Sequence, residues 1–481
     1  MRISELVAAV VDRPGLRDLS LVLPPDAPAE ADVELSRATH DSRAVTAGSL
    51  FCCVVGAVHD GHDHAPDAVA AGAAALLVER PLGLGVPELR TGSARAAMGP
   101  LAAELAGRPS DRLAVVGVTG TNGKTTTTHL LAAILEAAGR PCGLIGTLTG
   151  ARTTPEAPEL QDRLAQMADE GKAAVAMEVS SHALDLHRVD GTHFRVAVFT
   201  NLSRDHLDHH GDMASYFQAK ARLFEPDRCE LAVLNLDDPH GRLLRDAAEV
   251  PSVGYSLDDA EDLVLGPDGS TFTWRGAAVH LDLAGRFNVS NALAAATAAA
   301  ALGVTPADVA RGLATAGTVA GRFERVDVGQ PYLAVVDYAH TPDGLEQLLL
   351  TARELAGDGR VVLVFGAGGE RDHAKRPMMG EVAARLADVV VVTTDNPRGE
   401  DPAAIISQVH DGMDDPRDLR IEPDRRQAIR MAVASAEAGD VVLVAGKGHE
   451  TTQTIGSIVT PFDDREVLRE ALVAASAGDG R

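Results

Sequence analysis

The chain has 481 residues, of which 45% are hydrophobic and 23% are charged, and this composition excludes a disordered or collagen-like protein. Asp and Glu number 69 against 44 Lys and Arg, so the net charge is −25. A charge this negative repels phosphate backbones, and we expect no non-specific binding to nucleic acid or to anionic membranes. At about 150 residues per domain, the length predicts about three domains.

Four cysteines are too few and too scattered for a disulfide framework. Cys52 and Cys53 lie in the apolar run LFCCVVG, which predicts buried strand thiols. The first residues, MRISELVAAVVDRP, carry a Glu inside a short apolar stretch and do not resemble a signal peptide. The longest small-apolar run, 292–304, is too short and too rich in Ala to span a bilayer. We expect a cytoplasmic protein.

Residues 1–109 contain the short apolar stretches LFCCVVG and AALLVE between Ala-rich segments. This pattern predicts a small N-terminal α/β domain. The polar joint AGRPSDR follows at 106–112 and precedes a stronger signal.

Residues 110–316 begin with the buried-strand run LAVVGVTG, a Gly-Lys turn and a helix-like segment. Strand-like runs recur at 173–180, 195–203 and 231–238, with helical patterns between them. This alternation predicts a central domain with a mostly parallel sheet of the P-loop type. The segment 251–284 is richer in turn signals and predicts an antiparallel edge.

Residues 317–481 follow a helix-like segment and a turn at AGRFERV. Strand-like runs at 333–340, 360–369, 388–397 and 440–450 again alternate with helical stretches. They predict a C-terminal, Rossmann-like, doubly wound sheet. Ligands of such sheets lie at the carboxyl ends of the strands, and polar residues gather there in this chain. The predicted fold class is therefore α/β with three domains.

The clearest motif is a phosphate loop between a strand and a helix. Successive backbone N–H groups in such a loop form an anion nest, to which the helix N-terminus adds its positive end. Lys124 supplies a charge to terminal phosphates, and Thr125 is placed to hold Mg²⁺. The spacing departs from GxxxxGK[ST] because Val118 occupies the first Gly position, but the context predicts a nucleoside triphosphate site. The residues of this site are Gly120, Thr121, Asn122, Gly123, Lys124, Thr125 and Thr126.

Polar side chains also follow later strands of the central block. Glu178 ends the run AAVAMEV, and Asn201, Asp205 and His206 follow the run RVAVFT. A carboxylate and an imidazole beside a phosphate loop are suitable Mg²⁺ ligands, although Mg²⁺ prefers oxygen. The alternative is that they are polar residues of a surface loop.

The segment DHLDHHGD places His206, His209 and His210 close together, but this spacing fits no closed zinc site. A surface loop explains His209 and His210. Lys220 lies in the helix pattern YFQAKARLF, where a lysine normally snorkels or pairs with a carboxylate. Composition alone gives Lys220 no catalytic role.

The third block carries charged and amide side chains at successive strand ends. Arg and Asn can bind a carboxylate and Glu can bind an ammonium group, so the mixture predicts a site for a zwitterionic amino acid. Solvated loop charges are the alternative. The residues are Asp337, Tyr338, His340, Arg371, Lys375, Asp395, Asn396, Pro397, Arg398, Lys447, His449 and Glu450.

In order along the chain, HDSRAVTAGSLF, TGTNGKTTT, AMEVSSHAL, FTNLSRDHLDHHG, GRFNVSNALAA, VDYAHTPDGL and AGKGHE resemble the Mur ligase family of ATP-dependent amide-bond-forming enzymes. The resemblance covers nearly the whole chain. It implies that the enzyme extends UDP-N-acetylmuramoyl-L-alanyl-D-glutamate through an acyl phosphate. The element DNPR at 395–398 is similar to the branch that adds meso-2,6-diaminopimelate, and L-lysine is the alternative.

The resemblance also implies residue roles. Lys124, Glu178, His206 and Lys220 would be catalytic; Thr125 and Glu178 would hold one Mg²⁺, and Glu178, His206 and carbamylated Lys220 a second. The nucleotide-sugar substrate would contact His40, Ser42, Thr153, Thr154, Ser180 and Arg188. Diaminopimelate would contact Arg371, Asp395, Asn396, Pro397, Arg398, Gly446 and Glu450. Arg398 would take the carboxylate that lysine lacks.

Two further alternatives remain open. A folylpolyglutamate-synthase-like ligase would leave the HDSR block and the DNPR element without a role. A nucleotide-binding regulatory protein without ligase activity would have no need of Lys124, Glu178, His206 and Lys220 together. We expect a monomer.

Overall fold

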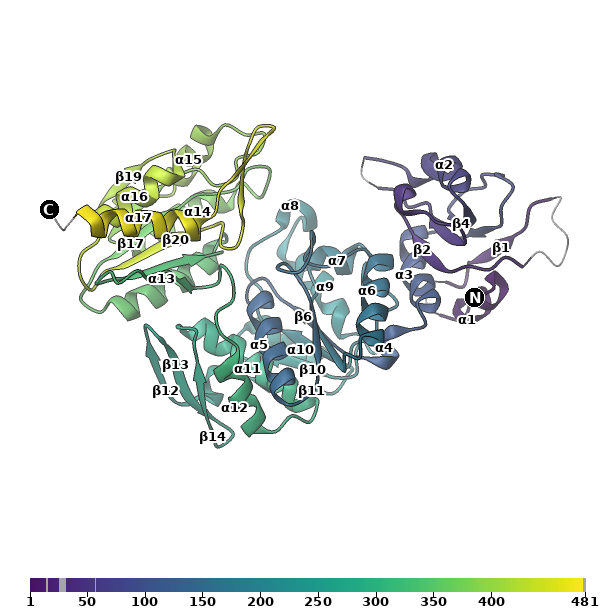
Figure 1. Ribbon diagram of the computed structural model, residues 1–481, viewed down its shortest axis with the longest axis horizontal. Helices are drawn as coiled ribbons and strands as arrows, with labels where there is room; N and C mark the ends of the chain where they lie inside the picture. The colour runs from purple at the N-terminus through teal and green to yellow at the C-terminus, as the bar shows by residue number, and fades with distance from the viewer. Residues whose placement is uncertain (14–15, 26–31, 57, 479–481) are drawn as a thin grey trace.

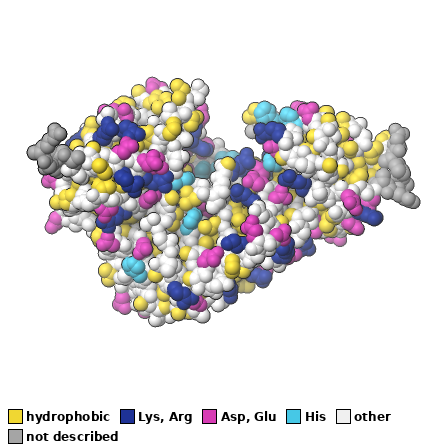
Figure 2. Space-filling model, in the orientation of Figure 1, with side chains coloured by type: hydrophobic (Ala, Val, Ile, Leu, Met, Phe, Trp, Pro, Cys, Tyr) yellow, Lys and Arg dark blue, Asp and Glu magenta, His cyan; other side chains and the backbone are white. Residues whose placement is uncertain are grey.

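The computed structural model describes residues 1–13, 16–25, 32–56 and 58–478. Figure 1 shows three α/β parts in a row, with the N-terminal part at one end, the C-terminal part at the other and the central part between them. The space-filling view is hollowed between the two outer parts, above the central one (Figure 2). No helix of the described residues is long and apolar enough to cross a membrane.

The N-terminal part is a five-stranded sheet with strand order β1-β5-β4-β3-β2. Only β1 runs antiparallel to its neighbour. Cys52 lies in β3 and Cys53 follows it, and all four cysteines are buried and free, which confirms the predicted buried thiols. The elements are α1 (Ile3–Val10), β1 (Ser20–Val22), β2 (Arg37–Thr39), η1 (Ser42–Ala44), β3 (Ser49–Cys52), η2 (Gly61–His64), α2 (Ala65–Ala70), β4 (Ala73–Val78), β5 (Glu88–Arg90) and α3 (Ala94–Leu105).

The central part is a six-stranded sheet with order β11-β10-β9-β6-β8-β7, and every pairing in it is parallel. Its strands are continuous apolar runs because helices cover both faces. Val116 and Val118 pack with α5, α11 and α12 on one face, and Val115 packs with α6 and α9 on the other. The elements are α4 (Pro109–Arg112), β6 (Ala114–Thr119), α5 (Lys124–Ala137), β7 (Cys142–Ile145), α6 (Ala157–Asp169), β8 (Ala174–Glu178), α7 (Ser181–Asp185), β9 (Val196–Phe199), α8 (Leu207–His210), α9 (Met213–Ala221), η3 (Arg222–Phe224), β10 (Ala232–Asn235), α10 (Pro239–Ala247), β11 (Ser252–Tyr255), α11 (Arg286–Ala301) and α12 (Pro306–Thr315).

The predicted antiparallel edge at 251–284 was wrong. β11 extends the main sheet in parallel, and the remainder of the segment forms a separate three-stranded antiparallel sheet, β12-β13-β14. The small sheet stands apart because its buried side chains, Phe272, Trp274 and Leu281, pack onto the helices of the central core. Its elements, with the turn before it, are η4 (Leu257–Asp259), β12 (Glu261–Gly266), β13 (Gly269–Trp274) and β14 (Ala277–Leu281).

The C-terminal part is a six-stranded sheet with order β15-β16-β20-β17-β18-β19, parallel except for β15. Separate hydrophobic cores lie on its two faces, which confirms the predicted doubly wound sheet. Its elements are β15 (Glu324–Arg325), β16 (Leu333–Asp337), α13 (Pro342–Ala356), β17 (Val361–Phe365), α14 (Lys375–Leu386), β18 (Val389–Val392), α15 (Pro402–His410), β19 (Leu419–Ile421), α16 (Arg425–Ser435), β20 (Val441–Ala445), β21 (Thr452–Ile455), β22 (Ile458–Pro461) and α17 (Asp464–Gly478).

Candidate active site

The phosphate loop joins the end of β6 to the start of α5. Gly120 and Gly123 have φ of 150° and 89°, which favour glycine, and a Cβ at Gly120 would collide with the hydroxyl of Thr200. Lys124 Nζ lies over the loop and donates to the carbonyls of Gly120 (2.9 Å) and Thr121 (2.8 Å). The loop therefore places one ammonium group and the N-terminus of α5 together at the end of a parallel strand, as a phosphate site requires.

The loop is held in place from β9. The Thr121 N–H donates to the Asn201 carbonyl, and the Asn122 N–H donates to Asn201 Oδ1, both at 2.9 Å. Thr126, at the start of α5, is buried. The residues of the predicted triphosphate site thus lie together in one loop and the first turn of α5.

Glu178 places a buried carboxylate beside the start of α5. Thr125 Oγ1 donates to Glu178 Oε2 at 3.0 Å, and the Thr147 N–H donates to Glu178 Oε1 at 2.8 Å. The side chain is 1% exposed. A hydroxyl and a carboxylate next to a phosphate loop are oxygen donors, so these residues fit a hard divalent cation such as Mg²⁺.

Lys220 is 1% exposed on α9, and its Nζ donates to the Gly120 carbonyl at 2.8 Å. The ammonium group lies 4.5 Å from the centroid of the Tyr216 ring. No ion pair of the described residues involves Lys220, so this lysine neither snorkels nor pairs with a carboxylate as a lysine in such a helix normally does. The cause is the packing of α9, which buries the whole side chain below the loop. Burial, and then the charge of Lys124, lower the pKa of Lys220 well below its ordinary value.

His206 is the N-cap residue before α8, with φ of 55°, and its Nε2 lies 3.3 Å from Asp205 Oδ2. Burial lowers the pKa of His206 to about 3, so the imidazole is neutral at pH 7. Asp205 also lies 3.7 Å from Lys375 Nζ and 3.8 Å from His340 Nε2, both in the C-terminal part. Asp205 therefore joins the central and C-terminal parts at the site.

Two more contacts join these parts. Arg204 Nε donates to Asp372 Oδ2 at 3.0 Å, and Asn122 Nδ2 donates to Asp343 Oδ2 at 2.9 Å. The sequence analysis missed Arg204, Asp372 and Asp343. Their only signal was their position beside the SRDH, GERDH and HTPDG motifs.

The residues predicted for the nucleotide sugar fall into two groups. Thr154 Oγ1 donates to the Glu178 carbonyl at 2.9 Å, and the Ser180 N–H donates to Thr154 Oγ1 at 3.1 Å. Thr153 lies beside them, with its hydroxyl 3.0 Å from that of Thr147. This first group continues the Glu178 region.

Arg188 extends the first group, because its Nη1 donates to the Thr154 carbonyl at 3.4 Å and its Nε lies 2.9 Å from Glu156 Oε1. His40 and Ser42 belong to the N-terminal part, at the end of β2 and in η1. Burial lowers the pKa of His40, and the charge of Glu156 partly offsets this effect. Arg95, which the sequence analysis missed, also faces Glu156, at 3.6 Å.

A pocket lies between the central and C-terminal parts. Six of the seven residues predicted for the amino acid line it, and Pro397 does not; Asp205, His206 and Asp208 of the central part line the same pocket. Both parts therefore meet where the sequence analysis placed the chemistry. The lining residues are Asp205, His206, Asp208, Tyr338, His340, Gly368, Arg371, Asp372, Lys375, Asp395, Asn396, Arg398, Gly446 and Glu450.

The carboxylates of the pocket differ in their hydrogen bonds. Asn396 Nδ2 donates to Glu450 Oε2 at 2.6 Å, and buried Lys447 Nζ donates to the same oxygen at 3.3 Å. Asp395 Oδ1 is buried and forms no hydrogen bond within the described chain, although Lys447 Nζ lies 3.8 Å away. Arg398, with φ of 51°, donates to the Gly369 carbonyl at 2.5 Å. The pocket thus presents a carboxylate oxygen and guanidinium groups to a ligand with charges of both signs.

Arg322 is a further residue that the sequence analysis missed. Its Nη2 donates to Thr125 Oγ1 at 3.2 Å, and its guanidinium carbon lies 4.3 Å from the centroid of the Tyr338 ring. The motif AGRFERV was interpreted only as a turn. Arg322 adds a positive charge beside the phosphate loop.

Sequence models of three Mur ligase domains match this chain. The family catalytic domain matches residues 34–106, the middle domain 118–299 and the glutamate ligase domain 321–448. The chain is 48% identical over 458 residues to UDP-N-acetylmuramoyl-L-alanyl-D-glutamate–2,6-diaminopimelate ligase of Geobacillus kaustophilus, with 90% of this chain and 94% of that protein covered. The chain belongs to the Mur ligase family.

Two further Mur ligases are similar to this chain. The protein of the same name from Streptomyces coelicolor is 47% identical over 474 residues, with 92% of this chain and 93% of that protein covered. A solved structure of a UDP-N-acetylmuramoyl-L-alanyl-D-glutamate–2,6-diaminopimelate ligase is 35% identical, has a TM-score of 0.66 and covers 92% of this chain and 95% of its own. The expected α/β Mur ligase architecture is confirmed.

Proposed function

We propose that this Mur ligase is an ATP-dependent ligase that adds meso-2,6-diaminopimelate to UDP-N-acetylmuramoyl-L-alanyl-D-glutamate in peptidoglycan precursor synthesis. The relatives described above carry this activity in their names. The observation that supports it most is the pocket in which Asp205 and His206 of the ATP side face Arg398 and Glu450 of the amino-acid side.

Each of three proposed domains would bind one substrate, and these domains are residues 1–109, 110–316 and 317–481. The first would bind the UDP portion of the acceptor, the second ATP and the third the incoming amino acid. The site between the second and third domains is where the new amide bond would form.

In the first step, the γ-phosphoryl group passes from ATP to the D-glutamate carboxylate oxygen and ADP leaves. Lys124 and Arg322 offset the negative charge of the transferred group, which is the main demand of phosphoryl transfer. In the second step, the amine of diaminopimelate attacks the acyl carbon through a tetrahedral intermediate. Phosphate leaves, the amine loses a proton and the amide remains.

Mg²⁺ would be held by Thr125 and Glu178, with Glu178, His206 and Lys220 at a second ion. When bound, it neutralises charge on the phosphate oxygens. The hydroxyl and carboxylate already paired at 3.0 Å fit such an ion. His206, neutral because burial lowers its pKa to about 3, offers a free nitrogen.

Lys220 would act in carbamylated form. Its neutral amine adds to CO₂, forming an N–C bond and releasing a proton, and the product is an anion that suits a cation site. The buried amine meets this need, because burial and Lys124 lower the pKa of Lys220 well below its ordinary value.

For the acceptor, His40, Ser42, Thr153, Thr154, Ser180 and Arg188 would contact the nucleotide sugar and its peptide. For the amino acid, Asp395 and Glu450 would hold ammonium groups, and Arg371, Asn396 and Arg398 would hold carboxylates, with Pro397 and Gly446 shaping the loops. Arg398 would bind the distal carboxylate that L-lysine lacks. The protein would act as a cytoplasmic monomer that binds neither nucleic acid nor membranes.

The test is ATP-dependent phosphate release with UDP-N-acetylmuramoyl-L-alanyl-D-glutamate, comparing meso-diaminopimelate with L-lysine. We expect release with diaminopimelate only. Phosphate release with L-lysine only would support a ligase reaction but contradict the proposed role of Arg398. Release with neither would overturn the proposed reaction.

A further inference from the structure

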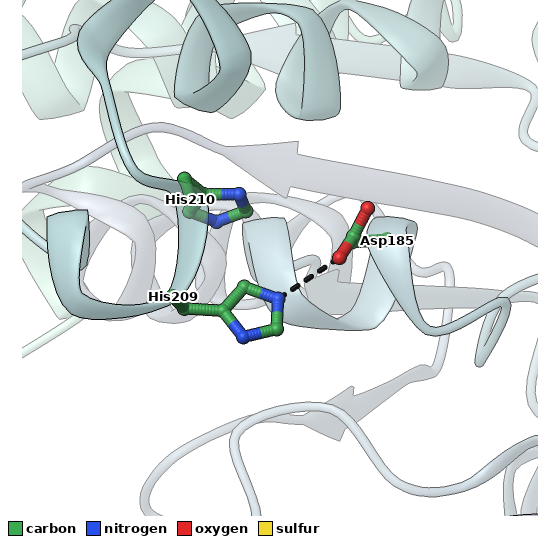
Figure 3. Close-up of side chains that lie close together, drawn as sticks. All are labelled: Asp185, His209 and His210. Carbon is green, nitrogen blue, oxygen red and sulfur yellow. Dashed lines mark hydrogen bonds and ion pairs between the residues drawn. The ribbon is translucent and has the colours of Figure 1, made fainter.

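A second cluster of metal-binding side chains lies on two short helices above the central sheet. Asp185 is the last residue of α7, and His209 and His210 are the last residues of α8. One ligand atom of each lies within 4.8 Å of those of the other two. Figure 3 shows the carboxylate of Asp185 directed at His209, with His210 beside them.

The turn that carries the two histidines is well defined. It begins at His206 and ends at Gly211, both with positive φ. The His209 and His210 N–H groups donate to the His206 carbonyl at 3.1 and 3.0 Å. Both imidazoles are therefore presented from a fixed turn toward the end of α7.

Neighbouring groups orient the ligands, as the outer contacts of a metal site do. His210 Nε2 lies 2.9 Å from Ser181 Oγ, so this ring is oriented by the first residue of α7. Asp185 Oδ1 lies 3.5 Å from Arg222 Nη1, while Asp185 Oδ2 lies 2.9 Å from His209 Nε2. The ring of His182 packs against that of His209, with centroids 4.2 Å apart.

Bond lengths of about 2.0–2.2 Å put two ligands of a tetrahedral zinc about 3.4 Å apart. The Asp185–His209 contact, at 2.9 Å, is already shorter than this, and the ligand atoms of all three residues lie within 4.8 Å of one another. Two nitrogens and one oxygen suit a borderline first-row ion such as Zn²⁺, whereas Mg²⁺ prefers oxygen. His209 is exposed and the other two residues are half-buried, which leaves the remaining positions to water.

We propose that Asp185, His209 and His210 form an open binding site for a divalent transition-metal ion, separate from the proposed Mg²⁺ site. This agrees with the expectation that DHLDHHGD forms no closed zinc site, because three protein ligands leave the coordination open. A bound ion joins α7 to α8 and holds the turn that His206 begins. The proposal does not depend on the ligase activity.

The experiment is calorimetric titration of the full chain with ZnCl₂ in excess MgCl₂, which keeps Mg²⁺ at the proposed site of Thr125, Glu178, His206 and Lys220. We expect one Zn²⁺ per chain. His209→Ala and Asp185→Asn should each weaken binding by about tenfold or more. Because His209 is exposed, His209→Ala should keep the melting temperature of the wild type.

The matched control is His280→Ala, which removes an exposed histidine 2.9 Å from Asp282 Oδ1. It should bind Zn²⁺ as the wild type does. Visible absorption of bound Co²⁺ gives a second measurement, with bands of low coordination number lost in His209→Ala. No zinc binding by the wild type, or undiminished binding by both His209→Ala and Asp185→Asn, would overturn the proposal.

Discussion

The phosphate-loop region and the interior of the C-terminal part differ in how their buried charges are compensated. Below the loop, Lys220 is buried without a carboxylate partner in the described chain, and Lys124 bonds only to backbone carbonyls. In the C-terminal part, Arg425 is paired with Asp464 and Lys447 with Glu450. An unpaired buried cation costs free energy unless it loses its proton or gains an anion. The lysines at the phosphate loop therefore lack carboxylate partners in the described chain and suit an anionic ligand or modification. The buried Arg425 and Lys447 of the C-terminal part already have carboxylate partners.

Arg425→Ala tests the buried ion pair of the C-terminal part and should have the largest effect of the substitutions on the free energy of unfolding. Arg425 and Asp464 are both fully buried, and Arg425 also donates to the Ala445 carbonyl at 2.8 Å. Leaving Asp464 unpaired should lower the free energy of unfolding by about 3–5 kcal/mol. Chemical denaturation measures this.

The matched control is Arg426→Ala, because Arg426 pairs with Glu470 at the surface. It should cost less than about 1 kcal/mol. Equal effects of the two substitutions would contradict the contrast between the regions.

Lys220→Ala tests the phosphate-loop region, where Lys220 has no carboxylate partner in the described chain. Removing the amine should lower kcat by about a hundredfold to a thousandfold, because a carbamate at this position is proposed to support charge neutralisation at the phosphoryl group. Short carboxylic acids should restore part of the rate, since they can replace the missing anion. Steady-state phosphate release measures both.

Lys172→Ala is the control, because Lys172 is half-buried and lies 3.6 Å from Glu136, away from the loop. Its kcat should stay close to that of the wild type, because neither Lys172 nor its partner Glu136 is assigned to the site. Full activity of Lys220→Ala would contradict the proposed role.

Arg398→Leu tests specificity in the pocket. Loss of a charge-assisted contact of about 1.5–3 kcal/mol should raise the KM for diaminopimelate by about tenfold to a hundredfold. The KM for ATP should not change. An unchanged KM for diaminopimelate would exclude Arg398 as its distal carboxylate ligand.

A pH effect of smaller size should come from His449 in the C-terminal part. Burial, and then the charge of Arg322, lower the pKa of His449 to about 4 from an ordinary value of 6.5. Between these values the unfolded chain binds a proton that the folded chain does not, so stability falls as pH falls from about 6.5 to about 4. His449→Gln should reduce this loss, measured as urea midpoints at several pH values.

The exposed His59→Gln variant is the comparison for His449→Gln and should leave the pH dependence as in the wild type. If His449→Gln lost as much stability as the wild type between about pH 6.5 and about pH 4, the imidazole of His449 would not be the cause of the pH dependence.

Sequence reasoning succeeded where neighbouring residues act together. The apolar runs of both large sheets were predicted because strands buried on two faces are continuously hydrophobic. The phosphate loop was predicted because strand, loop and helix are adjacent in the chain. By contrast, the burial of Lys220 depends on how α9 packs below the loop, which no local pattern reports.

Contacts between parts escaped prediction for the same reason. The hydrogen bond from Arg322 to Thr125 and the approach of Lys375 to Asp205 join residues far apart in sequence. The antiparallel sheet after β11 was misplaced because its pattern shows strands but not which sheet they join. The six pocket residues were found because they end parallel strands or lie in the loops that follow them, and such ends share one edge.

The central claim is that an acyl phosphate formed on the loop side is attacked by an amine held on the C-terminal side. The most direct measurement uses acceptor labelled with ¹⁸O in the reacting D-glutamate carboxylate and follows the label by mass spectrometry after turnover with ATP and diaminopimelate. The account predicts that each phosphate released carries one ¹⁸O from that carboxylate. Release of unlabelled phosphate, with both labelled oxygens absent from it, would contradict the claim.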